Sequence, residues 1–184
     1  MSLVDAVRRR FARAPEVVRA ALADGEQALA WGALTRDEGW LVATDRGLRR
    51  LGSDGVAGEP LPWHEVASAT WSGAGETGGT FTVTALAEVE PGVQARQPAE
   101  RHALADAGDL PAVVRRRVDQ TVVVSQRSPL PGRGGVLLVA RRIPGRAGRE
   151  WTVVFDDDAD RADPVAREVA RQKLAELVAA DQPD

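Results

Sequence analysis

Short apolar runs, broken by turns that contain glycine or proline, recur along most of this chain. The clearest example is WLVATDRGLRRL, residues 40–51, in which two runs flank Asp45, Arg46 and Gly47. Aspartate accepts hydrogen bonds from nearby backbone N–H groups, and glycine adopts positive φ without steric cost, so these residues suit a tight turn. The stretch therefore predicts a β-hairpin whose apolar side chains belong to a core.

The same pattern predicts further strands. In residues 80–86, TFTVTAL, the apolar Phe81 and Val83 alternate with threonines, which is typical of a strand with one buried face. Other segments with extended patterns are residues 27–35, 61–72, 120–126, 134–143 and 149–157.

Helices are predicted at both ends of the chain. Ser2 is a suitable cap for a first short helix with the apolar stripe Leu3, Val7 and Phe11, and Pro15 fits the first turn of a second. At the other end Asp163 is the predicted N-cap of a helix that begins at Pro164. Its apolar face is formed by Ala166, Val169, Ala170, Leu174, Leu177 and Val178.

These elements predict an α+β fold that is mainly β. We expect a small, bent antiparallel barrel or sandwich of about seven to eight strands, closed by the C-terminal helix and preceded by two short N-terminal helices. Residues 1–24 form the helical segment and residues 25–184 a single domain. Residues 87–119 carry the weakest pattern and are expected to be an irregular insertion.

One family resemblance follows from the hairpin and its surroundings. A Gly25-Glu26 lead-in, a strand with Trp31, the hairpin WLVATDRGL and the later LPWHEVASATW resemble bacterial pleckstrin-homology-like domains of the GRAM-related kind. The resemblance covers residues 25–86 and 120–180. It implies a bent barrel of about seven strands with a C-terminal helix, and it implies binding of lipid headgroups or proteins rather than catalysis.

Composition excludes several classes of function. The formal net charge is −3, so the chain as a whole is not a polyanion binder and no nucleic-acid partner is expected. Cysteine is absent, which excludes disulfides, thiolate metal sites and cysteine catalysis. The first residues are too charged for a signal peptide, and no apolar run approaches the roughly 20 residues that span a bilayer, so a cytoplasmic location is expected.

Arginines provide the candidate ligand-binding residues, because a guanidinium can grip a phosphate or carboxylate through two hydrogen bonds. The candidates are Arg46, Arg49, Arg50, Arg141 and Arg142. The alternative interpretation is that these arginines only solvate strand ends. Arg49 and Arg50 are adjacent in a strand and so point to opposite faces. At most one of them can serve a given pocket, so we expect no tight, specific phosphoinositide binding.

The run DDDADRAD, residues 156–163, has the spacing at which a calcium loop begins. The calcium motif then needs Gly at its sixth position and Glu at its twelfth, where this chain has Arg161 and Arg167. No metal site is predicted, and negative charge ahead of a helix explains the run. The competing hypothesis is a hydrolase or nucleotide-processing enzyme with an acidic site. Its residues would be Asp156, Asp157, Asp158 and Asp160, converging with His64 or His102.

The five tryptophans all lie in apolar strand segments, so packing is favoured over a surface on which nucleic-acid bases stack. The sequence therefore favours a non-enzymatic interaction module without catalytic residues, metal or cofactor, and a protein as its partner. Homodimerisation and weak membrane association are further expectations. A peripheral lipid-binding domain is the other alternative.

Overall fold

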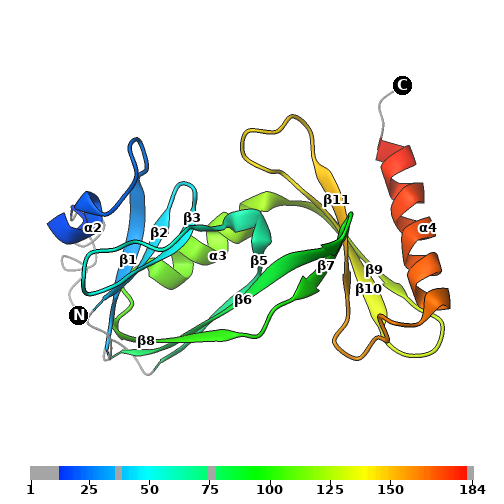
Figure 1. Ribbon diagram of the computed structural model, residues 1–184, viewed down its shortest axis with the longest axis horizontal. Coiled ribbons are helices and arrows are strands. Elements are labelled where there is room, and N and C mark those ends of the chain that lie inside the picture. Colours follow the sequence, from blue (N-terminus) through cyan, green and yellow to red (C-terminus); the bar gives the residue numbers. More distant parts are fainter. Residues whose placement is uncertain (1–12, 36–38, 74–77, 182–184) are drawn as a thin grey trace. The chain divides into compact units, whose positions relative to one another are not determined.

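The structure is a computed structural model that describes residues 13–35, 39–73 and 78–181 (Figure 1). Within these ranges the fold is α+β and mainly β, with eleven strands and three α-helices. The chain divides into two compact units. Unit 1 comprises residues 1–85 and 98–119, and unit 2 comprises residues 86–97 and 120–184.

Unit 1 begins with the short helix α2 (Glu16–Ala20), which matches the predicted second helix, and it ends with most of α3 (Leu110–Thr121). Between them, the 3₁₀ turn η1 (Trp63–Glu65) separates two groups of strands. The strands are β1 (Ala28–Leu34), β2 (Trp40–Thr44), β3 (Gly47–Leu51), β4 (Leu61–Pro62), β5 (Val66–Gly73), the first part of β6 (Gly79–Glu90) and β8 (Glu100–Asp106). They pair antiparallel in the order β4-β3-β2-β1-β8-β6-β5.

The main core of unit 1 lies between its sheet and α3 (Figure 1). Leu110, Val113 and Val114 have the i, i+3, i+4 spacing of one helix face, and all three are buried. They join a cluster that includes Phe81 of β6 and Leu104 of β8. The sheet thus buries one continuous apolar face against the helix.

The predicted hairpin of residues 40–51 is confirmed. Strands β2 and β3 pair antiparallel with Trp40 opposite Leu51 and Ala43 opposite Leu48. Gly47 is required where β4 comes alongside, because a Cβ at this position would lie 2.3 Å from the Leu61 carbonyl oxygen. Both faces of the hairpin are covered, one by the main core and the other by a small cluster around the fully buried Val18 of α2.

Unit 2 combines the end of β6 with a second group of strands and the helix α4 (Pro164–Asp181). The further strands are β7 (Val93–Arg96), β9 (Val122–Pro129), β10 (Gly135–Arg141) and β11 (Glu150–Phe155). Their order is β6-β7-β11-β10-β9, in which β7 and β11 are parallel and the other pairs antiparallel.

Helix α4 covers one face of the unit 2 sheet (Figure 1). Ala166 and Ala170 are buried against residues that include Val136 and Phe155, while Leu174 and Leu177 are only partly buried. The Asp163 carboxylate accepts a hydrogen bond from the backbone N–H of Val165 at 2.9 Å, so the predicted N-cap is confirmed.

The prediction of a barrel of seven to eight strands closed by the C-terminal helix is wrong. The hydrogen-bonded series of strands runs from β4 to β9, contains a parallel pair and is not closed. The reason lies in β6, whose residues 79–85 pair with β5 while residues 86–90 pair with β7. One long strand thus serves two groups of strands, and α4 packs on a sheet face instead of plugging a barrel end.

Residues 87–119, expected to be an irregular insertion, contain regular elements in the structure: the end of β6, β7, β8 and most of α3. Seven alanines and five arginines in this stretch dilute the apolar alternation on which a strand prediction depends. The predicted first helix with Leu3, Val7 and Phe11 lies outside the described residues.

The tryptophans pack as predicted. Trp63 is buried in the main core of unit 1 and Trp71 packs against that core. Trp31 and Trp40 pack in the cluster around Val18, and Trp151 packs in the core of unit 2.

Candidate functional site

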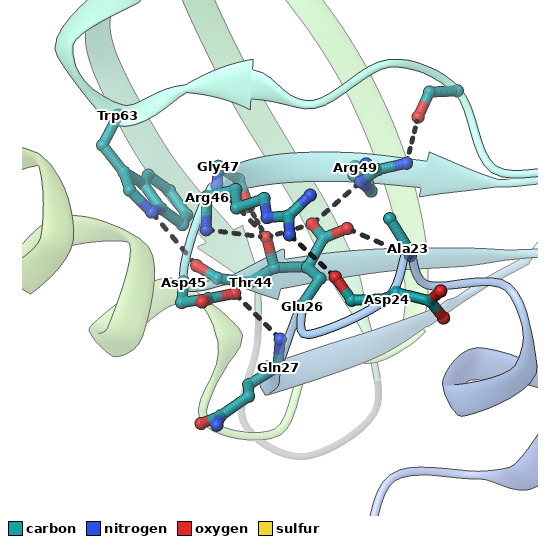
Figure 2. A network of polar contacts seen from close by, with 11 residues as sticks. Ala23, Asp24, Glu26, Gln27, Thr44, Asp45, Arg46, Gly47, Arg49 and Trp63 are labelled. Atoms are coloured by element: carbon teal, nitrogen blue, oxygen red, sulfur yellow. Dashed lines mark hydrogen bonds and ion pairs between the residues drawn. The ribbon is translucent and has the colours of Figure 1, made fainter. Parts of the chain in front are cut away.

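A network of buried polar contacts in unit 1 is centred on Glu26, whose side chain is completely buried (Figure 2). One carboxylate oxygen accepts hydrogen bonds from the Thr44 hydroxyl at 2.7 Å and from Nε of Arg49 at 2.9 Å. The other oxygen accepts from the backbone N–H of Ala23 at 3.4 Å. A buried carboxylate is tolerated only when it is paired and hydrogen-bonded in this way.

Thr44 extends this network into the hairpin turn (Figure 2). Its hydroxyl accepts hydrogen bonds from the backbone N–H groups of Arg46 and Gly47, both at 3.1 Å, and its carbonyl accepts one from the indole N–H of Trp63. The Asp45 carboxylate accepts a hydrogen bond from the backbone N–H of Gln27 at 2.8 Å. The network therefore fastens the segment before β1 to the β2–β3 turn.

Two of the predicted ligand-binding arginines are used inside this network. The Arg46 guanidinium donates to the Asp24 carbonyl at 2.9 Å, and Arg49 donates to the Gly58 carbonyl at 3.0 Å besides its bond to Glu26. Arg50 is exposed and lies opposite Leu41, whereas Arg49 lies opposite Val42, so the predicted division between two faces is confirmed. These three arginines do not form one cluster.

The other two predicted arginines belong to unit 2 and also diverge. Arg141 is 7% exposed, and its Nη1 donates to the Thr121 hydroxyl at 2.9 Å. Burial lowers the pKa of Arg141. Arg142 is exposed, and its backbone N–H donates to the Thr121 carbonyl at 2.8 Å. The expectation that tight phosphoinositide binding is absent stays a prediction.

The acidic run before α4 does not gather around one point. Asp156 pairs with Arg127 at 2.7 Å, Asp157 with Arg96 at 3.1 Å and Asp158 with Arg133 at 3.5 Å. Asp160 accepts a hydrogen bond from the Ala162 backbone N–H. Across the described residues, no group of three or more His, Asp or Glu side chains is placed to hold a metal ion.

The two histidines lie in unit 1, whereas the acidic run lies in unit 2. His64 is part of η1 instead of the strand position that was predicted, and its Nε2 lies 3.7 Å from Glu65. His102 lies on β8 with Nε2 3.7 Å from Glu100. Burial lowers the pKa of His102, Glu100 opposes this effect and Arg50 adds to it. The hypothesis of an acidic catalytic site stays a prediction.

A further feature, which was not predicted from the sequence, is a set of strands that lie at the border of a sheet. In the described part of the chain, β4, β5 and β9 each pair with one neighbour only. Over residues 67–73 of β5, no backbone group makes a hydrogen bond to any described segment besides β6. The sequence signal was available, since VASATWSG contains neither a charged residue nor proline.

Exposure along β5 alternates. Ser68, Thr70 and Ser72 are exposed, whereas Ala69 and Trp71 are partly buried and pack against the main core of unit 1. The strand therefore has a hydroxyl-bearing outer face and an apolar inner face, and between them a row of backbone N–H and C=O groups that no described segment pairs. Such a row can accept a further strand.

Comparisons with protein-family models, with curated proteins and with solved structures found no match to this chain. No helix among the described residues is long and apolar enough to cross a membrane.

Proposed function

We propose that this protein is a non-enzymatic interaction module that binds an extended protein segment along the free edge of β5. The observation that carries the proposal is the edge at residues 67–73 of an eight-residue strand, which no segment among residues 13–35, 39–73 and 78–181 pairs. Main-chain hydrogen bonds from such an edge supply affinity that does not depend on the partner's side chains, and alternate side chains supply selectivity.

The three single-neighbour strands differ in how they discourage pairing. Strand β4 has only two residues, one of them Pro62. Strand β9 contains Arg127 and Pro129, and its register with β10 shifts near Arg141. Short length, charge, proline and irregular register are the devices by which proteins protect sheet edges. Strand β5 has one register shift, before Ser68, and none of the other devices.

The β5 edge also defines the kind of segment that fits. On the inner face, apolar side chains of the partner would pack beside Ala69 and Trp71. On the outer face, the short hydroxyl side chains of Ser68, Thr70 and Ser72 leave no bulk to exclude it. We expect the partner to supply an alternating strand with apolar residues on one side and small polar residues on the other.

The pleckstrin-homology-like resemblance covers residues 25–86 and 120–180, which lie largely in unit 1 and in unit 2 respectively, and it stays a prediction. The module works in the cytoplasm and binds protein in preference to lipid, because Arg46 and Arg49 are already engaged in internal contacts.

The proposal is tested by comparing proteins retained from a native cytoplasmic extract by the tagged chain and two variants. Thr70→Lys places a charge on the β5 edge, and Ser125→Lys places the same charge on the exposed part of β9. We expect proteins that bind the unchanged chain and Ser125→Lys to be lost with Thr70→Lys. Identical retained proteins for all three, counting among them an untagged copy of this chain added to the extract, with all three folded by circular dichroism, would refute the proposal.

A further inference from the structure

We infer that the strand bound by β5 is the β5 strand of a second copy of this chain, paired antiparallel across a two-fold axis. The inference rests on the proposed function, since it requires that β5 accept a strand. It adds the identity of the partner and the register of pairing.

The first observation is a ladder of hydroxyl side chains on the outer face of β5 and β6. Ser68 lies opposite Thr84, Thr70 opposite Thr82 and Ser72 opposite Thr80. The β5 members are exposed and the β6 members partly buried. Serine and threonine directly opposite one another form favourable cross-strand pairs. The rows of paired hydroxyl side chains therefore stop at β5, because no described strand lies on its other side.

Symmetry limits how two β5 strands can pair. A two-fold axis perpendicular to the sheet places the outer faces of both copies on the same side of the joined sheet. Even-numbered β5 residues must therefore lie opposite even-numbered ones, and odd-numbered opposite odd-numbered. The β5 ladder is irregular between Val66 and Ser68 and regular from Ser68 to Gly73. A pairing centred on Thr70 uses this regular part most fully.

The Thr70-centred register is self-complementary on both faces. On the outer face Thr70 meets Thr70 of the second copy, and Ser68 meets Ser72, so the hydroxyl ladder continues across the axis without a break. On the inner face Ala69 meets Trp71, which sets a small side chain against a large one. Charge imposes no penalty, because β5 has no ionisable side chain to be set against its own copy.

A contact built on one strand pair belongs to the small end of protein–protein interfaces. We therefore expect a dimer that dissociates on dilution. The test is analytical ultracentrifugation of the full chain over a series of concentrations from low to high micromolar. The unchanged chain and the control Ser125→Lys should convert reversibly between monomer and dimer.

Two charge variants test the register. Thr70→Lys and Thr70→Glu each place like charges next to each other at the axis, and each should be monomeric throughout the concentration series. An equimolar mixture of the two sets lysine against glutamate and should restore the dimer. Only a site in which residue 70 meets its own counterpart gives this rescue. A second variant pair, Ser68→Lys mixed with Ser68→Glu, should give weaker rescue because Ser68 meets Ser72.

The outcomes separate this inference from the proposed function. A chain that is monomeric at every concentration, while Thr70→Lys still abolishes retention of another protein, would overturn the second-copy inference and leave the proposed function standing. A dimer that survives both single charge variants would also overturn the inference, because its interface would lie elsewhere. If Thr70→Lys kept both the dimer and the retained protein, the second-copy inference and the proposed function would both be overturned.

Discussion

The Glu26 carboxylate lies 2.9 Å from Nε of Arg49, and the two side chains are 0% and 11% exposed. They come from segments separated by the whole β1–β2 region, so their pairing fixes the chain before β1 against the β2–β3 hairpin. Removing one member of a buried pair leaves the other charge without compensation, which is far more costly than removing both.

We predict that Glu26→Gln destabilises unit 1 by about 3–5 kcal/mol. The loss should appear as faster hydrogen exchange of the β2 and β3 amides and as a lower urea midpoint. Arg49→Met combined with Glu26→Gln should cost clearly less than the sum of the single changes. The control is Glu168→Gln, which removes an exposed pair with Arg171 and should cost less than about 1 kcal/mol. If the free-energy costs of the two single changes simply added up in the double variant, Glu26 and Arg49 would not stabilise the fold as a pair.

A second prediction concerns Arg141. Its guanidinium is buried, donates to Thr121, and has no carboxylate within 4.0 Å in the described part of the chain. A buried charge without an opposite partner opposes folding.

We therefore expect Arg141→Met, which keeps the length and removes the charge, to leave the free energy of unfolding unchanged or to raise it by up to about 2 kcal/mol. Chemical denaturation followed by hydrogen exchange of the β10 and β11 amides measures this change in unit 2. Arg142→Met at the exposed neighbouring position is the control. A loss of more than about 2 kcal/mol in Arg141→Met alone would show that the charge supports the fold.

Local patterns predicted the hairpin, the strand of residues 80–86 and the capped terminal helix, because each depends on residues close together in sequence. Closure of the sheet depends instead on which strands meet along β6, and no local pattern carries that information. The contacts of the candidate arginines could not be predicted for the same reason. Nothing around Arg49 in the sequence reveals that its partner is Glu26, 23 positions earlier.

The edge of β5 that no described segment pairs could be predicted from the sequence only in part. The sequence VASATWSG shows that the strand lacks charge and proline. An edge, however, is a strand side without a neighbouring strand, and only the strand order shows where a neighbour is absent among the described residues. Alternation alone predicts a strand and does not say whether that strand lies inside a sheet or at its border.

A third prediction concerns the end of α4. The Asp181 carboxylate accepts a hydrogen bond from the Trp151 indole N–H at 2.8 Å and also pairs with Arg149, and it is only 14% exposed. Asp181→Ala should destabilise unit 2 by about 1–3 kcal/mol, because two donors lose a partly buried partner. The Trp151 part of the emission, obtained as the difference from the same protein with Trp151→Phe, should shift to longer wavelength as water reaches the indole. Glu176→Ala, at an exposed position of the same helix, should change neither quantity.

The last prediction is a pH dependence that arises from His102. Its side chain is 13% exposed, and burial lowers its pKa below the ordinary value of 6.5, with Arg50 acting in the same direction and Glu100 against it. Between the lowered pKa and 6.5 the unfolded chain binds the proton more readily than the folded chain, so stability falls as the pH falls. The contribution is fully present above pH 6.5 and is lost as the pH drops through the lowered pKa.

We expect the urea midpoint of unit 1 to be lower at pH 5.5 than at pH 7.5, and His102→Gln to reduce that difference. His64→Gln removes the other histidine and shows whether any part of the slope belongs to it. If His102→Gln retained the whole difference between the two pH values, the buried imidazole would not be its source.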